Sequence, residues 1–372
     1  MKCKLSDICS FRKGKVEVEN LNVKNYISTE NMLPNKCGIT EASSLPTVSL
    51  TQEYKNGDVL VSNIRPYFKK IWQAQYDGGC SNDVLVFVPK TNTDKDFLYY
   101  VLADDDFFTY SMATSKGTKM PRGDKTSIMQ YEVPLIDLQV QEKIASVLKA
   151  LDKKIELNNE INNNLEQQAQ AIYQQMFIDN ARSDWAEGTL SDIADITMGQ
   201  SPNGSSYNED GTGTIFFQGR AEFGFRFPSV RLYTTEPKRM ARLNDTLMSV
   251  RAPVGDLNVA HMDCCIGRGL AAIHSKSHHQ SFVLYTMFSL KKQLDVFNGE
   301  GTVFGSINRN SLNDMPILIP SDDILDEFER IVAPMDLTIR NNYDENCRLQ
   351  DIRDTLLPRL MSGELDVSDI DL

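Results

Sequence analysis

Residues that could cradle a nucleotide phosphate occur between Gly117 and Thr126, but their spacing is wrong for that task. A phosphate-binding loop needs four residues between its two glycines, with a lysine directly after the second. Here five residues separate Gly117 from Gly123, and Asp124 stands before Lys125. Because the Asp124 carboxylate would repel a phosphate, the pattern predicts no nucleotide site.

Zinc and methyl-transfer chemistry are no better supplied. Cysteine-rich zinc sites carry Cys-x2-Cys pairs. None of the seven cysteines has that spacing, and the adjacent Cys264 and Cys265 are expected to be small buried residues. Enzymes that methylate the amino group of a base extrude that base and hold it with an Asn/Asp-Pro-Pro-aromatic loop, and the chain has no Pro-Pro pair. We therefore expect no catalytic residue, no cofactor and no metal site.

The composition is that of a folded protein large enough for two domains. The chain has 372 residues, of which 41% are hydrophobic and 24% charged. No apolar run approaches the ~20 residues of a membrane span, and the first residues lack the apolar core of a signal peptide. Irregularly spaced cysteines fit a reducing compartment. We expect a cytoplasmic protein with no membrane association.

The net charge of −12 does not exclude a nucleic-acid partner, because the acidic residues are concentrated at one end. Residues 1–138 hold 17 basic and 17 acidic side chains, and residues 188–320 hold 12 of each. Residues 321–372 hold 5 basic and 14 acidic side chains. The two large blocks are neutral, and each could carry a basic face.

Five short matches recur in the same order in the two halves of the chain, at offsets of 182 to 187 residues. They are Leu5–Ile8 with Leu190–Ile193, Gly57–Leu60 with Asn244–Leu247, Leu98–Tyr99 with Leu284–Tyr285, Gly117–Thr118 with Gly301–Thr302, and Pro134–Ile136 with Pro316–Leu318. In each half a β-rich block precedes a helical one, so the chain is a tandem repeat.

The helical blocks carry the 4–3 apolar spacing of a coiled-coil seam. In the first block, which has no Gly or Pro from Gln139 to Ile178, the seam residues are Ile144, Leu148, Leu151, Ile155, Asn158, Asn162, Leu165, Ala169, Ile172 and Met176. A shift of 184 residues gives Phe328, Val332, Met335, Ile339, Asn342, Asn346, Leu349, Arg353, Leu356 and Leu360. Pro334 is expected to kink or break the second helix.

Two asparagines interrupt each seam and could set the register of the pair. If the helices run antiparallel, with residue x opposite residue 504 − x, Asn158 faces Asn346 and Asn162 faces Asn342. Polar pairs in a seam cost stability and can fix register. The alternative is that these asparagines are solvated positions on helices that pack elsewhere. We favour the antiparallel pairing, in which only Arg353 is poorly matched.

Three segments are specific enough to identify relatives. They are PLIDLQVQEKIASVLKALDKKIELNNEINNNLEQQAQAIYQQMF at 134–177, DWAEGTLSDIADITMG at 184–199 and LLPRLMSGELDVS at 356–368. With them, the whole chain resembles the specificity (S) subunit of type I restriction–modification systems.

The resemblance implies an α+β chain with two α/β target recognition domains in tandem repeat, separated by two long helices that form an antiparallel coiled coil. The expected boundaries are a first recognition domain at 1–138, a central conserved helix at 139–180, a second recognition domain at 181–320, and a distal conserved helix with an acidic tail at 321–372. Each domain would read one half of a split double-stranded DNA target. The helices would act as a ruler and as a platform for two methyltransferase (M) subunits, which restriction (R) subunits join. The S subunit itself catalyses nothing.

DNA contacts require Lys or Arg for phosphates, and Arg, Lys, Asn, Gln, Ser or Thr for base edges. The candidates in the first block are Arg65, Lys69, Lys70, Lys116, Thr118, Lys119 and Arg122. Those in the second are Gln218, Arg220, Arg226, Arg251, Ser306, Asn308 and Arg309. The alternative for each is an ordinary solvated loop. Arg65 and Arg251, and the loops at 116–122 and 302–310, recur at matching places in both halves, which favours function there.

The rival interpretation is a standalone bipartite DNA-binding regulator without methyltransferase partners. A regulator needs only the seams buried, whereas a scaffold needs apolar surface beyond them. Leu157, Ile161 and Tyr173 lie off the seam, which favours the scaffold.

Overall fold

The computed structural model describes residues 2–299, 305–365 and 367. The chain divides into two compact units: Met1–Leu157 with Asp344–Leu372, and Asn158–Tyr343. The end of the predicted acidic tail, at 366 and 368–372, lies outside the described residues. Each long helix therefore begins in one unit and ends in the other.

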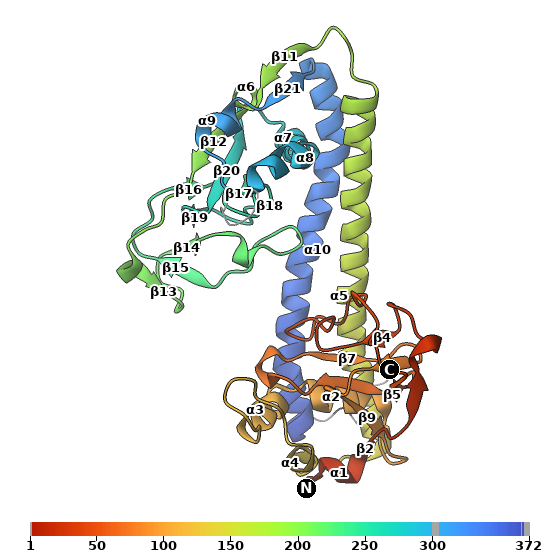
Figure 1. Cartoon of the computed structure of the whole chain (residues 1–372). Coiled ribbons are helices and arrows are strands. Elements are labelled where there is room, and N and C mark those ends of the chain that lie inside the picture. Colours follow the sequence, from red (N-terminus) through yellow and green to blue (C-terminus); the bar gives the residue numbers. More distant parts are fainter. Residues whose placement is uncertain (1, 300–304, 366, 368–372) are drawn as a thin grey trace. The chain divides into compact units, whose positions relative to one another are not determined.

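The first unit contains two four-stranded sheets, a short two-stranded pairing and three short helices after the sheets (Figure 1). One sheet has the order β2-β9-β6-β7, from Cys9–Phe11, Val84–Pro89, Val59–Ser62 and Ile71–Gln73. The other has the order β3-β5-β8-β4, from Lys15–Glu17, Leu50–Tyr54, Gly78–Cys80 and Tyr26–Ile27. β1 (Lys2–Lys4) pairs with β10 (Glu132–Pro134), and the helices are α1 (Leu5–Ile8), α2 (Lys95–Ala103), α3 (Asp105–Ala113) and α4 (Lys125–Ile128).

The second unit repeats this plan. Its four-stranded sheet has the order β12-β20-β17-β18, from Ala194–Met198, Leu270–Ser275, Thr246–Ser249 and Leu257–Val259. A second sheet has the order β13-β15-β14-β19-β16, from Tyr207–Asn208, Leu232–Thr234, Thr214–Phe217, Cys264–Ile266 and Met240–Ala241. β11 (Ala186–Thr189) pairs with β21 (Pro316–Ile319), and the helices are α6 (Leu190–Ile193), α7 (Gln280–Ser289), α8 (Lys291–Asp295) and α9 (Arg309–Asn313).

The sequence matches correspond to the same local structures in both units. The Leu-Ser-Asp-Ile pair forms α1 and α6, each closed at its start by the aspartate: Lys4 N donates to Asp7 Oδ2 at 2.8 Å and Thr189 N to Asp192 Oδ2 at 2.7 Å. The matched Asp58 and Asp245 are buried and close the turns before β6 and β17. These residues therefore serve the fold.

The helical blocks form α5 (Leu138–Tyr173) and α10 (Asp322–Ser362). A π-helical turn, Gln174–Asp179, continues α5. All twenty predicted seam residues are described, and none of them is exposed. Of the two outcomes expected at Pro334, a kink or a break, the break does not occur, because α10 continues through it. Phe328, Val332 and Ile339 are fully buried on either side of Pro334, and this packing offsets the lost hydrogen bond and the steric clash that a proline introduces.

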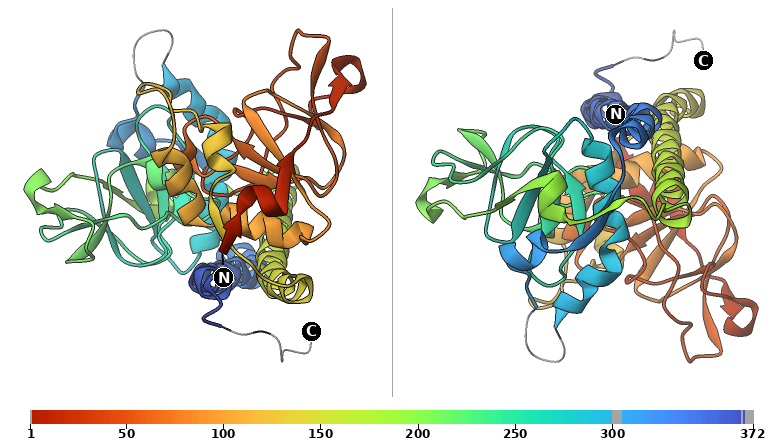
Figure 2. Two further views of the ribbon diagram at one scale, coloured as in Figure 1. Left: turned by 90° about the horizontal axis from the view of Figure 1, so that it is seen from below. Right: turned by 90° about the horizontal axis from the view of Figure 1, so that it is seen from above.

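Within each unit, segments of α5 and α10 lie side by side (Figures 1 and 2). In the first unit Arg353 Nη1 donates to Asp152 Oδ1 at 2.8 Å, and Lys154 pairs with Glu345 at 3.2 Å. In the second, Asn342 Nδ2 donates to Asn162 Oδ1 at 2.8 Å. As the residue numbers rise on α5 they fall on α10, so the segments run antiparallel.

Candidate nucleic-acid interface

In the first unit the end of β6 meets the predicted basic loop. Arg65 N donates to Pro121 O at 2.8 Å, and Gly123 N donates to Asn63 O at 3.1 Å. A Cβ on Gly123 would lie 2.7 Å from Asn63 Oδ1, so any other residue at this position would require the Asn63 side chain to move. Because the structure brings the two first-unit candidate segments together, they form one surface.

The loop itself is a short folded-back turn. Lys116 and Arg122 exchange two backbone hydrogen bonds, at 2.8 and 2.9 Å, and Gly117 has a left-handed φ of +92°. Thr118 and Lys119 lie at its exposed tip. The closed base of the turn fixes where these tip residues point.

A strained turn presents two aromatic side chains beside this loop. Arg65 and Lys69 are non-glycine residues with φ of 49° and 50°, on either side of the 3-10 turn Pro66–Phe68. Such conformations cost free energy and are found preferentially at functional sites. Tyr67 and Phe68 are exposed, with ring centroids 4.7 Å apart. Neither Tyr67 nor Phe68 was among the candidates chosen from the sequence.

The first-unit candidate cations differ in how far acidic neighbours neutralise them. Arg65 and Lys119 are exposed, and neither side chain has a hydrogen bond or ion pair with another described residue. The paired candidates are Lys69 with Asp105 at 2.7 Å, Lys116 with Asp124 at 2.5 Å, and Arg122 with Asp83 at 3.1 Å, while Lys70 donates to Thr29 O at 2.6 Å. Asp83 and Asp105 come from other elements, so sequence proximity could not reveal them.

Asp124 has a structural task that explains why an acid stands in a basic loop. Its Oδ1 accepts a hydrogen bond from Ser127 N at 2.9 Å, which caps α4. The hydrogen bond from Lys116 and those from Ser127 lower the pKa of Asp124 to about 2. The carboxylate is therefore charged at neutral pH and offsets part of the positive charge of the loop.

The second unit forms an equivalent joint, meaning the backbone contact between the segment after a sheet strand and the glycine-containing loop. Ala252 N donates to Gly305 O at 3.0 Å, and Ile307 N donates to Val250 O at 3.1 Å. Through these bonds Arg251 and Ser306 form an isolated antiparallel β-bridge. A Cβ on Gly305 would lie 2.0 Å from Phe297 O. Residues 301–304 of the predicted loop lie outside the described residues.

The candidates at this second joint divide into exposed and structural side chains. Arg251, Ser306, Asn308 and Arg309 are all exposed. Asn308 caps α9, because its Oδ1 accepts a hydrogen bond from Ser311 N at 2.9 Å. It therefore corresponds to Asp124, 184 residues earlier, and brings no negative charge.

Of the remaining second-block candidates, Gln218 is exposed and Arg220 forms an ion pair with Asp256. The expectation that Arg226 lies on an exposed, DNA-contacting loop is not met. It is only 4% exposed, and its guanidinium lies 3.0 Å from Glu166 of α5 and 3.3 Å from Asp336 of α10. Because carboxylates from two long helices hold this cation inside the unit, Arg226 is not exposed for contact with DNA. Burial raises the pKa of Asp336 and of Glu166, and Arg226 opposes both shifts.

The arginine belongs to an attachment that occurs in both units and that sequence reasoning missed. Tyr285 OH donates to Asp336 Oδ1 at 2.8 Å, and Tyr100 OH donates to Asp152 Oδ2 at 2.7 Å. The tyrosines are 185 residues apart and the aspartates 184, so the repeat offset could have revealed the pair. In each unit the bond ties the helix after the sheets to the long helix that follows in sequence.

Of the three residues off the seam that were predicted to face a partner, two are exposed and one is buried. Leu157 and Ile161 of α5 are exposed. Tyr173 is buried, packs against Phe282 and Phe328, and donates to Thr286 Oγ1 at 3.1 Å. Tyr173 therefore cannot serve as partner-binding surface, and its apolar ring supports the core of the second unit instead.

Known proteins that are similar to this chain include specificity subunits of type I restriction enzymes. Residues 1–167 match the family model for the type I restriction modification DNA specificity domain. A type I restriction enzyme specificity subunit of Methanocaldococcus jannaschii, MjaX, is 28% identical over 98% of this chain and 93% of its own length. The HindI specificity subunit of Haemophilus influenzae is 24% identical over 91% and 94%.

A solved structure shares the fold. The type I restriction–modification system S subunit from M. genitalium has a TM-score of 0.61, with 16% identity over 97% of this chain and 96% of that one. Among the described residues, no helix is long and apolar enough to cross a membrane. The resemblance predicted from the sequence is confirmed: residues 1–167 match the model for the type I restriction modification DNA specificity domain, and the chain is similar along nearly its whole length to type I specificity subunits.

Proposed function

We propose that this chain is the DNA sequence-recognition subunit of a type I restriction–modification complex and has no catalytic activity of its own. The observation that carries the proposal is the recurrence, in both units, of one joint between an arginine at a strand end and a glycine-containing loop. A split target needs two readers, and the relatives named above are specificity subunits.

The two units are proposed to act as tandem target recognition domains, each reading one half-site of double-stranded DNA. Arg65 and Arg251 are the leading base-reading candidates, because arginine binds guanine edges with two hydrogen bonds. Lys69, Lys116, Lys119, Arg122, Arg220 and Arg309 are candidates for phosphate contacts. The acids near several of these cations would lower non-specific affinity by offsetting charge.

The long helices are proposed to form an antiparallel coiled coil that sets the distance between the half-sites and carries two methyltransferase subunits, with restriction subunits joining that core. The hydrogen bond between Asn162 and Asn342 supports a register-fixing role for the asparagines, including Asn158 and Asn346. The exposed Leu157 and Ile161 offer apolar surface that a standalone regulator would not need.

The test is co-expression with a methyltransferase subunit, followed by mapping of methylated motifs in the host DNA. We expect one bipartite motif, two specified half-sites around an unspecified spacer, that disappears when either partner is omitted. A regulator would bind DNA alone and leave the methylation pattern unchanged. Methyl transfer from S-adenosylmethionine by the purified chain would contradict the proposal.

A further inference from the structure

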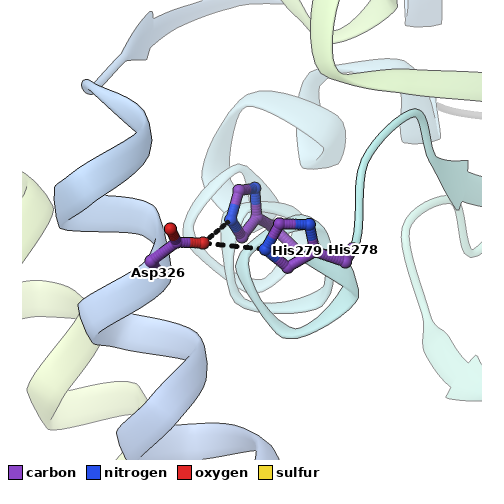
Figure 3. A group of neighbouring side chains, drawn as sticks. All are labelled: His278, His279 and Asp326. Atoms are coloured by element: carbon purple, nitrogen blue, oxygen red, sulfur yellow. Dashed lines mark hydrogen bonds and ion pairs between the residues drawn. The ribbon is translucent and has the colours of Figure 1, made fainter.

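Three metal-ligand side chains meet where α7 begins against α10. His278 Nε2 and His279 Nε2 both lie at hydrogen-bond distance from Asp326 Oδ1, at 2.7 and 2.8 Å (Figure 3). The ligand atoms of the three residues all lie within 4.8 Å of one another. All three residues belong to the second unit.

In the first unit the corresponding contact, between the start of α2 and α5, contains no histidine. Gln141 of α5 accepts a hydrogen bond from Asp94 N at 3.0 Å and donates to Asn92 O at 3.2 Å, just before α2 begins. Asp96 in the first turn of α2 pairs with Lys149 of α5, so an amide and an ion pair hold this contact. The second unit uses two imidazoles and a carboxylate there, and Glu329, one turn further along α10, accepts a hydrogen bond from Phe282 N at 2.9 Å.

The donor set and its surroundings fit a transition-metal ion. Imidazole nitrogen and carboxylate oxygen are ligands of zinc, cobalt and nickel, and three protein ligands with an open fourth position form a common zinc arrangement. Ligand atoms around tetrahedral zinc are about 3.3 Å apart. A shift of about half an ångström by the exposed Asp326 carboxylate would bring its distances to the two imidazole nitrogens, now 2.7 and 2.8 Å, to that value.

A second contact holds one of the two imidazole rings in place. His279 is 4% exposed, and its Nδ1 lies 2.9 Å from Ser277 Oγ, the type of second contact that orients a metal-binding histidine. His278 and Asp326 are 75% and 57% exposed, so an ion can enter. His278 also lines a cavity of about 270 Å³.

We propose that His278, His279 and Asp326 bind one divalent transition-metal ion of the zinc class, which fastens the start of α7 to α10 in the second unit. The site is independent of the proposed DNA-recognition function. Because residues 1–157 and 344–372 contain no histidine, the metal acts on the second unit alone.

The test is metal uptake by the full chain, purified without a histidine tag and treated with EDTA. Equilibrium dialysis against micromolar zinc, with elemental analysis, is expected to give one zinc per chain, and added zinc should raise the melting temperature reversibly. Cobalt should give the visible absorption of a four-coordinate ion. Magnesium and calcium, which prefer all-oxygen ligands, should not compete.

The exposed ligands provide variants that can fold. His278→Ala and Asp326→Asn should each weaken zinc binding roughly tenfold or more. His274→Gln is the matched control, because it removes the other His–Asp contact, His274 Nδ1 to Asp245 Oδ1 at 2.6 Å, and should retain one zinc. Absence of stoichiometric uptake by the unaltered chain would overturn the proposal, as would equal uptake by both ligand variants.

Discussion

Arg65 and Arg251 are the residues on which specificity is expected to depend. Both are exposed at the matched joints. Arg65→Ala or Arg251→Ala should weaken binding to the cognate site by about 1–3 kcal/mol, the discrimination given by a bidentate arginine–guanine contact. The measurement is fluorescence anisotropy with the methyltransferase complex at physiological salt.

Arg182→Ala provides the control for these two variants. Arg182 is exposed, pairs with Asp184 and lies outside both joints, so its removal should leave affinity nearly unchanged. If both interface variants also bind normally, these arginines do not read the target.

Arg226 is expected to matter for stability instead. Arg226→Ala would leave the partly buried carboxylates of Glu166 and Asp336 without their cation, and for a fully buried pair such a change costs about 3–5 kcal/mol. Arg220→Ala removes an exposed ion pair and should cost about 0–1 kcal/mol. Urea denaturation distinguishes the two variants, and equal losses would contradict the burial of Arg226.

The asparagine pair links the two long helices. Asn162→Leu alone would leave the Asn342 amide without its partner and should cost about 1–3 kcal/mol. The double variant Asn162→Leu, Asn342→Leu buries apolar groups in the seam and should be at least as stable as the unaltered chain. A double-mutant cycle by denaturation measures this, and a double variant less stable than either single one would refute the pairing.

The elements that could be predicted are those with a local signal. The 4–3 spacing located both helices, because a helix buries one face whatever packs on it. The repeated Leu-Ser-Asp-Ile and Gly/Asn-Asp segments identified matching turns, because capping depends on neighbours in sequence. Pro334 does not break α10 as the sequence alone allowed, because the buried residues around it hold the helix together.

What could not be predicted depends on elements far apart in the chain. The sequence placed Arg226 among the DNA-contact candidates, and only the folded unit brings Glu166 and Asp336 to its side chain. Likewise Asp83 and Asp105 reach the basic segments from other elements. The net charge of such a surface depends on residues from several elements of the folded unit. The local sequence alone therefore overestimated its positive charge.

The whole molecule can be tested as a ruler, because both long helices run through both units. α5 has 36 residues and α10 has 41. Inserting one heptad after Leu157 and one after Tyr343, at the boundary of the units, preserves the seam because its pattern repeats every seven residues. The insertion lengthens each helix by about 10 Å, which corresponds to roughly three base pairs of spacer.

The half-site bases should not change in this variant, because no candidate recognition residue is altered. The added twist between half-sites requires DNA distortion, so affinity should fall. The measurement is the methylated motif of the variant with its methyltransferase partner. A folded, active variant with an unaltered spacer, or with different half-site bases, would show that the helices do not set the spacing, and the distance would then have to come from the recognition units themselves.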